Sequence, residues 1–488
     1  MKVLFATSEI APWVKTGGLG DVAAALPPAL RSVSYPGGCD VRVLVPRYPA
    51  LREAFPDAEH LVHLPWLGGH LPAADLYAAQ HADGLPFLLL DCPPLFERSG
   101  NPYLGPEGHD WLDNHLRFGL LSRIAARLAG PDTPLDDWRP DILHCHDWQT
   151  ALAPYYLRFH EGAPRARSVI TIHNLAFQGN FAPEFLGELA LGPDDWHLEG
   201  VEYYGRLSFL KAGLRHADAL TTVSPTYARE IQTDAEGMGM QGLLRQRAQD
   251  LSGILNGIDA AVWNPATDPH LAVRYDRAHL DGKAQCKAAL QREVGLEVRD
   301  DRPLFGIVSR LTHQKGLDLV AAVGAHLVAL PAQIVVLGSG EKGLEQAFRE
   351  LAARHPGEVA VTIGFDEPLS HRIEAGADIF LMPSRFEPCG LNQMYSLAYG
   401  TPPLVRATGG LADTVVNYSL AGLADGSANG FVCHAATPEA ILGTAGWAHG
   451  VWQDRPRWRQ LQQNAMAREN GWDGPARRYL DLYTGLLR

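Results

Sequence analysis

Short apolar runs alternate with longer amphipathic segments along the whole chain. Most of the runs are separated by roughly ten or more residues whose apolar positions recur at helical spacing. Buried parallel strands read as continuous apolar runs because helices cover both faces of their sheet. The pattern therefore predicts an α/β fold with parallel sheets. The predicted strands are Val3–Ala6, Val41–Val45, Phe87–Leu90, Ile142–His144, Val169–Ile172, Ala219–Val223, Leu304–Val308, Gln333–Leu337, Val359–Ile363, Ile379–Met382 and Pro403–Val405.

The predicted strands fall into two groups, which indicates two domains. A chain of 488 residues also exceeds what one hydrophobic core ordinarily supports. The turn pair Asn256-Gly257 lies between the groups, and Pro265 follows it. We therefore place the first domain at residues 1–250, the second at 251–465 and a C-terminal helix at 466–488. The apolar stripe of that helix predicts that it docks on one of the two domains.

Composition narrows the class of protein. The net charge of −13 argues against nucleic acid and against an anionic membrane surface as partners. Six cysteines without a C-x-x-C pair fit a reducing compartment. The first strand is interrupted by Glu9 and is too short for a signal peptide, and no run of about 18 apolar residues occurs. We expect a soluble cytoplasmic protein.

The second half carries a candidate ligand site after the predicted strand Ile379–Met382. A polar loop and a helix start follow this strand, at the sheet edge where open α/β folds bind ligands. The backbone N–H groups of Gly390, Leu391 and Asn392 would suit a phosphate if a helix opens at Gly390. Glu387 lies just before them, and its carboxylate is better suited to ligand hydroxyls than to an anion.

Two cations follow the predicted strand Leu304–Val308. Arg310 and Lys315 lie five residues apart in a strand-to-helix loop and can converge on a diphosphate. The segment Gly338–Gly343 matches G-x-G-x-x-G, but it follows the second strand of its half and not the first. We interpret it as a tight strand-to-helix turn near a nucleotide and not as a nicotinamide site.

The first half carries its own glycine-rich helix start. The segment Lys15–Val22 reads K-T-G-G-L-G-D-V, and Thr408–Val415 in the second half echoes it as T-G-G-L-A-D-T-V. Paired glycines allow close backbone approach to a ligand, and Lys15 adds a compact positive charge. Two such helix starts, one in each half, suit a ligand gripped from both domains.

Two histidines at the end of the predicted strand Ile142–His144 raise the question of a metal site. His144 and His146 face the same way on an extended segment, and Asp147 could be a third ligand. No other cluster of histidine and cysteine is spaced to complete a tetrahedron. We expect no metal and favour His146 as a substrate-facing residue, and His173 is a similar but weaker candidate.

These motifs together resemble those of the bacterial, ADP-glucose-using branch of the glycogen and starch synthases. They occur in family order and span nearly the whole chain. The matching segments are K-T-G-G-L-G-D-V at Lys15–Val22, H-D-W at His146–Trp148, H-N-L at His173–Leu175, K-A-G-L at Lys211–Leu214, V-S-P-T-Y-A-R-E-I at Val223–Ile231, L-N-G-I-D at Leu255–Asp259, S-R-L-T-x-Q-K-G-L-D at Ser309–Asp318, S-R-F-E-P-C-G-L at Ser384–Leu391 and T-G-G-L-A-D-T-V at Thr408–Val415.

The resemblance implies a fold and an activity. The fold is GT-B: two facing Rossmann-like domains with parallel sheets and a cleft between them, the donor site mainly in the second, and the C-terminal helix crossing back to the first. The activity is retaining transfer of glucose from ADP-glucose to the non-reducing end of an α-1,4-glucan, which elongates glycogen. The partners are then ADP-glucose and a glycogen or malto-oligosaccharide acceptor. No cofactor is implied.

Catalytic roles carry over by position. The resemblance implies that Glu387 holds the transferred glucose beside His146, while Arg310 and Lys315 neutralise the leaving diphosphate. Two cations there would stabilise the developing charge electrostatically, so no metal is needed.

Substrate-binding roles carry over in the same way. Phe365 stands where the family often has tyrosine against the adenine, and Asn392 stands where related enzymes often have threonine. Both departures bear on donor selectivity. The implied substrate-binding residues are Lys15, Gly18, Asp21, Asn256, Phe365, Gly390, Leu391 and Asn392.

Two alternatives stay open at this point. Another GT-B transferase, such as a sucrose- or phosphosugar-forming one, would share Arg310, Lys315 and Glu387 but not the motif at Lys15. A catalytically silent glucan- or nucleotide-binding homologue would usually have lost some of the charged residues.

Overall fold

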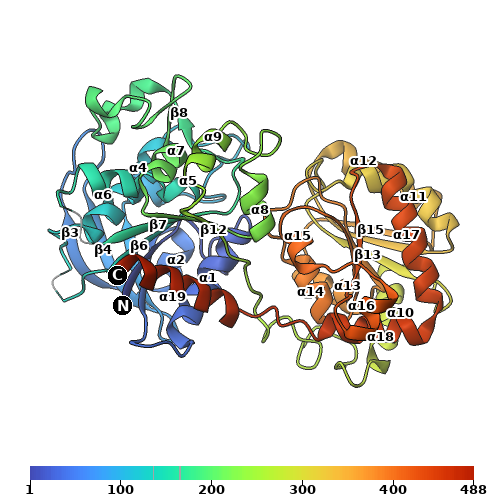
Figure 1. The fold of residues 1–488 in the computed structure, drawn as a ribbon. Coiled ribbons are helices and arrows are strands. Elements are labelled where there is room, and N and C mark those ends of the chain that lie inside the picture. The colour runs from blue at the N-terminus through green and yellow to red at the C-terminus, as the bar shows by residue number, and fades with distance from the viewer. Residues whose placement is uncertain (136, 164–165) are drawn as a thin grey trace. The chain divides into compact units, whose positions relative to one another are not determined.

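The computed structural model of the chain describes residues 1–135, 137–163 and 166–488 (Figure 1). These residues form two compact units. Unit 1 consists of Met1–Gly257 and Trp472–Arg488, and unit 2 consists of Ile258–Gly471. Each unit is built on one large sheet.

The large sheet of unit 1 has nine strands. Along the sheet they follow the order β12-β11-β7-β6-β1-β2-β5-β4-β3. The seven strands from β12 to β5 in this order include all six strands predicted for this half. The strands are β1 (Lys2–Ala6), β2 (Asp40–Pro46), β3 (Glu59–Leu64), β4 (Ala74–Gln80), β5 (Pro86–Asp91), β6 (Ile142–His146), β7 (Arg167–Ile172), β11 (Ala219–Thr222) and β12 (Leu251–Gly253).

Three strands of this sheet were not predicted. β3 and β4 form an antiparallel edge, in which β4 pairs with β5 and β3 pairs with β4. β3 is mostly exposed, so its sequence lacks the apolar run of a buried strand. β12 pairs in parallel with β11, and the chain therefore leaves unit 1 after Gly257, a few residues beyond the predicted border. A small separate sheet contains β8 (Asn180–Phe181), β9 (Glu202–Tyr203) and β10 (Arg206–Ser208).

The sheet of unit 2 has six parallel strands in the order β15-β14-β13-β16-β17-β18. In chain order this is 3-2-1-4-5-6, the order of doubly wound dinucleotide-binding folds. The first five strands match the prediction, and the short sixth was missed. The strands are β13 (Leu304–Val308), β14 (Gln333–Gly338), β15 (Val359–Ile363), β16 (Ile379–Met382), β17 (Pro403–Arg406) and β18 (Phe431–Cys433).

Apolar side chains cover both faces of the unit 2 sheet. In β14, Ile334 and Val336 join one buried cluster, while Val335 and Leu337 join another. Successive side chains of a strand point to opposite faces, so a continuous apolar run is what two covered faces require. The prediction of a doubly covered sheet is confirmed here.

Helices connect the strands in both units. No helix among the described residues is long and apolar enough to cross a membrane. In unit 1 the helices are α1 (Gly18–Ser32), α2 (Pro49–Ala54), α3 (Pro93–Phe96), α4 (Asn114–Ala129), α5 (Asp147–Thr150), α6 (Ala153–Phe159), α7 (Phe209–His216), α8 (Pro225–Glu230), α9 (Gln241–Gln246) and α19 (Asp473–Leu487), with 3-10 turns η1 (Pro183–Phe185), η2 (Gly187–Leu189) and η3 (Pro193–Asp195). In unit 2 they are α10 (Asp281–Val294), α11 (Leu317–Ala329), α12 (Lys342–Arg354), α13 (Glu367–Gly376), α14 (Asn392–Ala398), α15 (Gly409–Thr414), α16 (Leu420–Asp425), α17 (Pro438–Gln453) and α18 (Arg455–Met466).

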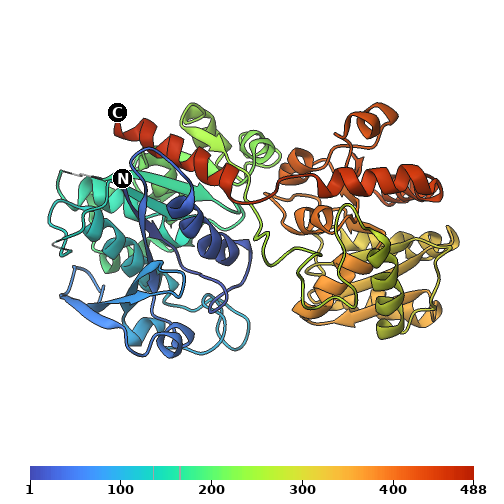
Figure 2. The ribbon, with the colours of Figure 1, turned by 90° about the horizontal axis from the view of Figure 1, so that it is seen from below.

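The C-terminal helix α19 belongs to unit 1. Figures 1 and 2 both show it, in red, beside the dark blue helix α1, and the two helices are in contact. Its buried residues Ala476, Tyr479, Leu480 and Tyr483 recur at helical spacing. This is the face that the apolar stripe predicted.

Each sheet has one place where the winding reverses. In unit 1 it lies between β1 and β6, because β2 lies on one side of β1 and β6 on the other. In unit 2 it lies between β13 and β16. Ligands of open α/β sheets bind outside the carboxyl ends of the strands at such points. The loops after these four strands are therefore the places to look for a site.

A glycine in β13 offers a test of this packing. A Cβ on Gly306 would lie 2.8 Å from the Cβ of Ala377 and 2.9 Å from Cγ2 of Ile373. We expect Gly306→Ala to lower the free energy of unfolding of unit 2 by about 1–3 kcal/mol, measured by urea unfolding. The control is Gly443→Ala in α17, where a Cβ meets nothing within 4 Å. Alanine there should be neutral or stabilising by up to about 1 kcal/mol. Equal losses in the two variants would contradict the packing argument.

Candidate active site

An ion pair occupies the switch point of unit 2. Nζ of Lys315, in the loop after β13, lies 2.8 Å and 2.6 Å from the two carboxylate oxygens of Glu387, in the loop after β16. The hydroxyl of Ser384 donates to the same carboxylate at 2.9 Å. The side chain of Glu387 is 7% exposed and that of Lys315 is 18% exposed. The structure therefore brings together two of the four predicted catalytic residues, in a pair largely withdrawn from water.

A second ion pair ties the same two loops together. Arg385 contacts Asp318 at 2.6 Å and 2.8 Å, and it also donates to the carbonyl oxygen of His313 at 2.7 Å. The backbone N–H of Arg385 donates to the carbonyl oxygen of Gln314 at 2.8 Å. Three connections between the loops leave Glu387 and Lys315 little freedom to separate.

The T-G-G-L echo in unit 2 has a packing role. A Cβ on Gly409 would overlap the carbonyl oxygen of Glu387, and one on Gly410 would overlap that of Cys389. The N–H of Gly410 donates to Glu387 and Pro388 carbonyl oxygens at 3.2 Å and 3.1 Å. These glycines allow the start of α15 to pack directly against the backbone of the Glu387 loop. The similarity between the two glycine-rich segments did not predict this packing role.

The G-x-G-x-x-G segment supports the other loop in the same way. A Cβ on Gly338 would overlap the carbonyl oxygen of Ser309, and one on Gly340 would overlap that of Leu311. The N–H of Leu311 donates to Ser339 at 2.9 Å. The segment thus makes the tight strand-to-helix turn that was predicted, and its glycines are needed for contact between loops.

The remaining predicted residues of unit 2 lie around this edge. Arg310 is exposed, and its guanidinium has no partner among the described residues. Phe365 follows β15 and is 85% exposed. The side-chain amide of Asn392 donates to the carbonyl oxygen of Val308 at the end of β13, at 2.7 Å.

The helix after β16 begins later than predicted. Gly390 has φ +72°, a left-handed conformation, and the helix α14 starts at Asn392. Leu391 is its flanking residue. The expectation of a helix opening at Gly390 is therefore wrong, because that residue's backbone is not helical.

The glycine-rich loop of unit 1 is held by a buried carboxylate. Glu9 accepts hydrogen bonds from the backbone N–H and the hydroxyl of Thr16, both at 2.6 Å, and from the hydroxyl of Tyr103. Gly18 is the first residue of α1, and Lys15 pairs with Asp21 at 2.7 Å. Sequence reasoning missed Glu9 and Tyr103 in this role, although an acid shortly after an apolar strand was a visible signal.

His146 ends β6 at the switch point of unit 1. It is fully buried, and its Nδ1 lies 2.9 Å from Nε2 of His173. Burial holds the pKa of His146 well below its usual range and lowers that of His173 to about 3, so both rings are neutral at pH 7. Nε2 of His146 has no partner among the described residues. Of the two ring nitrogens of His146, Nε2 is therefore the one whose hydrogen-bonding capacity is unused in the described part of the chain.

The carboxylate of the neighbouring Asp147 accepts hydrogen bonds from backbone N–H groups. It has φ 54°, and its carboxylate accepts from the N–H of His173 at 2.7 Å and that of Asn174 at 3.4 Å. Burial raises its pKa to about 7. Among the described residues no group of three or more histidine, cysteine, aspartate or glutamate side chains is placed to hold a metal ion.

Asn256 lies in unit 1, just after β12. It is 6% exposed, and its side-chain oxygen has no partner among the described residues. A buried amide oxygen without a donor costs stability unless a ligand or water supplies one.

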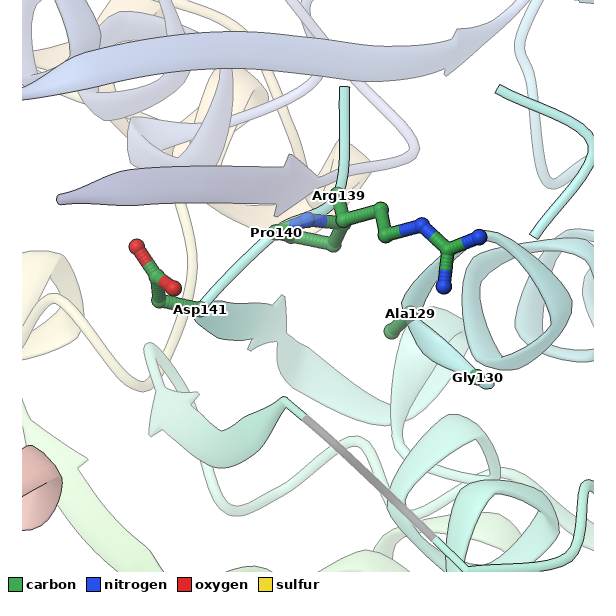
Figure 3. Close-up of a pocket in the computed structure, with 5 residues that line it drawn as sticks. All are labelled: Ala129, Gly130, Arg139, Pro140 and Asp141. Atoms are coloured by element: carbon green, nitrogen blue, oxygen red, sulfur yellow. The ribbon is translucent and has the colours of Figure 1, made fainter. Parts of the chain in front are cut away.

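A small cavity lies elsewhere in unit 1 (Figure 3). It has a volume of about 140 Å³, and it is lined by Ala129, Gly130, Arg139, Pro140 and Asp141. Asp141 directly precedes β6, so the cavity is at the amino end of that strand, opposite the edge that carries His146. None of the predicted site residues lines it.

Comparisons with known proteins place this geometry in a family. A model of the starch synthase catalytic domain matches residues 2–246, and a model of glycosyl transferases group 1 matches residues 292–445. A glycogen synthase from Dechloromonas aromatica (strain RCB) is 59% identical over 483 residues, which cover 99% of this chain and 98% of the relative. A glycogen synthase from Nitrosospira multiformis (strain ATCC 25196 / NCIMB 11849 / C 71) is 52% identical over 491 residues. The match covers 100% of this chain and 97% of the relative.

Solved structures agree with the sequence relatives. The catalytic domain of starch synthase IV from Arabidopsis thaliana, bound to ADP and acarbose, superimposes with a TM-score of 0.85 at 32% identity, covering 99% of this chain and 98% of that one. A sucrose-phosphate synthase from Thermosynechococcus elongatus, with a TM-score of 0.60 at 17% identity, shares the fold alone. The predicted resemblance and the GT-B class of two Rossmann-like domains are confirmed. The chain belongs to the glycogen and starch synthase family of glycosyltransferases.

Proposed function

We propose that this chain transfers glucose from ADP-glucose to the non-reducing end of an α-1,4-glucan, with retention of the α configuration, and so elongates glycogen. The observation that carries the proposal is the buried pair of Lys315 and Glu387 at the switch point of unit 2, in a chain of this family. The relatives at 59% and 52% identity are glycogen synthases, and the starch synthase structure holds ADP and acarbose. A glycogen or malto-oligosaccharide acceptor follows from the same relatives.

The pair of Lys315 and Glu387 suits the charges of this reaction. Breaking the anomeric bond produces a sugar with oxocarbenium character and a diphosphate leaving group. The ammonium group of Lys315 can stabilise the negative charge that develops on the diphosphate, while the carboxylate of Glu387 accepts hydrogen bonds from the sugar hydroxyls. Arg310 is exposed and unpaired among the described residues, so its guanidinium is available to the diphosphate without first breaking an ion pair.

His146 would assist as a neutral group. Its lowered pKa leaves a neutral imidazole at pH 7, and its Nε2 is the atom without a partner in the described part of the chain. A neutral ring can hydrogen-bond a glucose hydroxyl without repelling a sugar that gains positive charge.

The other proposed contacts fit their surroundings. Phe365, at 85% exposure, offers a ring face for adenine stacking. Lys15, Gly18 and Asp21, at the start of α1, would meet the donor diphosphate or sugar, and Asn256 would present its free amide oxygen to the sugar. Gly390, Leu391 and Asn392 would offer backbone N–H groups to glucose or phosphate.

The proposal includes a cytoplasmic location and no nucleic-acid or membrane partner. All six cysteines lie in the described part of the chain and none of them forms a disulfide, which suits a reducing compartment. The net charge of −13 disfavours polyanionic partners.

Donor choice tests the proposed function directly. With glycogen as acceptor, we expect a higher kcat/KM for ADP-glucose than for UDP-glucose, because an aromatic face at Phe365 stacks better on a purine than on a smaller pyrimidine. Release of nucleoside diphosphate and incorporation of labelled glucose give both values. Controls without acceptor measure hydrolysis. A preference for UDP-glucose, or diphosphate release without incorporation, would contradict the proposal.

The charges of the central pair are expected to act in the transition state. Glu387→Gln keeps the size of the side chain, and Lys315→Met keeps much of its length. Each should lower kcat by about 10²–10³, the usual effect of losing one contact to a developing charge. Because a single change leaves one buried charge unpaired, the double variant should recover stability without recovering kcat.

The matched control for that experiment is Glu293→Gln. Glu293 forms a two-bond ion pair with Arg372, at 2.8 Å and 2.7 Å, between α10 and α13 and not in the loops of the switch point. Its loss should leave kcat unchanged. A near-normal kcat in Glu387→Gln would remove the central residue of the proposal.

We also propose that the reaction needs no metal or other cofactor, because Arg310 and Lys315 provide cations for the leaving group. Dialysis against a strong chelator should then leave kcat within about twofold of the untreated enzyme. Adding back Mg²⁺ or Mn²⁺ to the dialysed protein is the control. Loss of activity that a divalent ion restores would show that the side-chain cations are insufficient.

A further inference from the structure

A chain of hydrogen bonds connects the C-terminal helix with the centre of the unit 1 sheet. The hydroxyl of Tyr483, on α19, lies 2.7 Å from Nδ1 of His144 on β6. Nε2 of His144 lies 2.7 Å from the hydroxyl of Thr171 on β7, which lies 2.6 Å from that of Thr221 on β11. All four side chains are fully buried. Buried polar groups in such a chain are costly to leave unpaired, so the whole arrangement is fixed when α19 is docked.

The direction of these bonds follows from protonation and from the acceptors that the described residues offer. Burial lowers the pKa of His144 to about 3 and raises the pKa of Tyr483 well above its usual range, so both side chains are neutral at pH 7. Among the described residues, Nδ1 of His144 is the one acceptor within reach of the buried O–H of Tyr483, so the tyrosine donates there. The proton of His144 is then on Nε2, where it donates to Thr171. The ring of His144 therefore has one tautomer and one orientation, set at both ends.

The ring of His144 in turn contacts His146. The two ring centroids are 4.1 Å apart, and the ring of Phe5 lies 4.0 Å from His146. Together with the hydrogen bond to His173, these contacts determine where Nε2 of His146 points. Among the described residues no hydrogen bond or ring contact joins Tyr483 to His146, but Tyr483 holds the ring of His144, which His146 contacts.

We propose that Tyr483 is a positioning residue for His146, acting through His144, so that the end of the chain takes part in building the active site of unit 1. The inference rests on the proposed placement of His146 against the transferred glucose. It gives docking of α19 a role in the reaction in addition to its role in covering the apolar core.

The test is the Tyr483→Phe variant, which keeps the aromatic ring and removes the hydroxyl. Nδ1 of His144 then loses its donor, and the ring is free to change tautomer or turn. We expect kcat to fall about tenfold, the typical effect of one lost hydrogen bond, with the KM for ADP-glucose unchanged. Spectra of the ¹⁵N-histidine-labelled protein should show the single Nε2–H tautomer of His144 replaced by a mixture, together with shifted His146 ring signals.

The matched control is Tyr35→Phe. The hydroxyl of Tyr35 also bonds α19, at 3.0 Å to Asp481 and 3.1 Å to Thr484, but the residue has no contact with His144. This variant should weaken docking of α19 and leave kcat and the His146 signals as in the parent. Thermal unfolding of both variants shows that the assays are run on folded protein.

Each outcome decides the inference. An unchanged kcat and unchanged histidine signals in Tyr483→Phe would overturn it, and so would an equal loss of kcat in Tyr35→Phe, which would indicate a merely structural helix. His146→Ala separates this failure from failure of the proposed function. If His146→Ala keeps its kcat, the glucose-contacting role of His146 fails, and the inference fails as a statement about catalysis, whatever the spectra of Tyr483→Phe show about the ring.

Discussion

The close approach of backbone segments in unit 2 is the constraint on which the candidate site depends. Four glycines, at positions 338, 340, 409 and 410, lie against carbonyl oxygens of the two loops at the switch point, where no Cβ fits. Because the loops are held this closely, an acid from one and a lysine from the other meet away from water. Burying a charged pair costs desolvation free energy. Its electrostatic interaction with a charged substrate is in turn stronger than it would be in water.

The side chains at the switch point of unit 1 differ in charge from those of unit 2. In unit 1 the central groups are neutral histidines, since burial favours the uncharged imidazole. The carboxylates nearest to it are occupied: Glu9 by Thr16 and Tyr103, and Asp147 by backbone N–H groups. The switch point of unit 2 thus carries a charged pair, whereas that of unit 1 carries buried, uncharged hydrogen-bonding groups.

The histidines also link the site to the stability of unit 1. His144 and His173 have pKa values of about 3 in the folded protein, below the ordinary value of 6.5. An unfolded chain binds these protons first, so their contribution to stability is fully present above pH 6.5 and is lost as the pH falls toward 3. The same burial that keeps His146 neutral therefore makes the unit sensitive to acid.

The sequence by itself determined the elements and the family. Continuous apolar runs gave the strands buried on both faces, and the motifs after those runs identified Lys15, His146, Arg310, Lys315 and Glu387 as candidates. Exposed or very short strands, such as β3 and β18, were not predicted, because a continuous apolar run arises only where a strand is buried on both faces. Only the tertiary structure decided that Lys315 pairs with Glu387, that Glu9 supports the glycine loop, and that Tyr483 reaches His144. Such contacts join residues far apart in the chain, and no local pattern of side chains encodes which distant partner a polar group will meet.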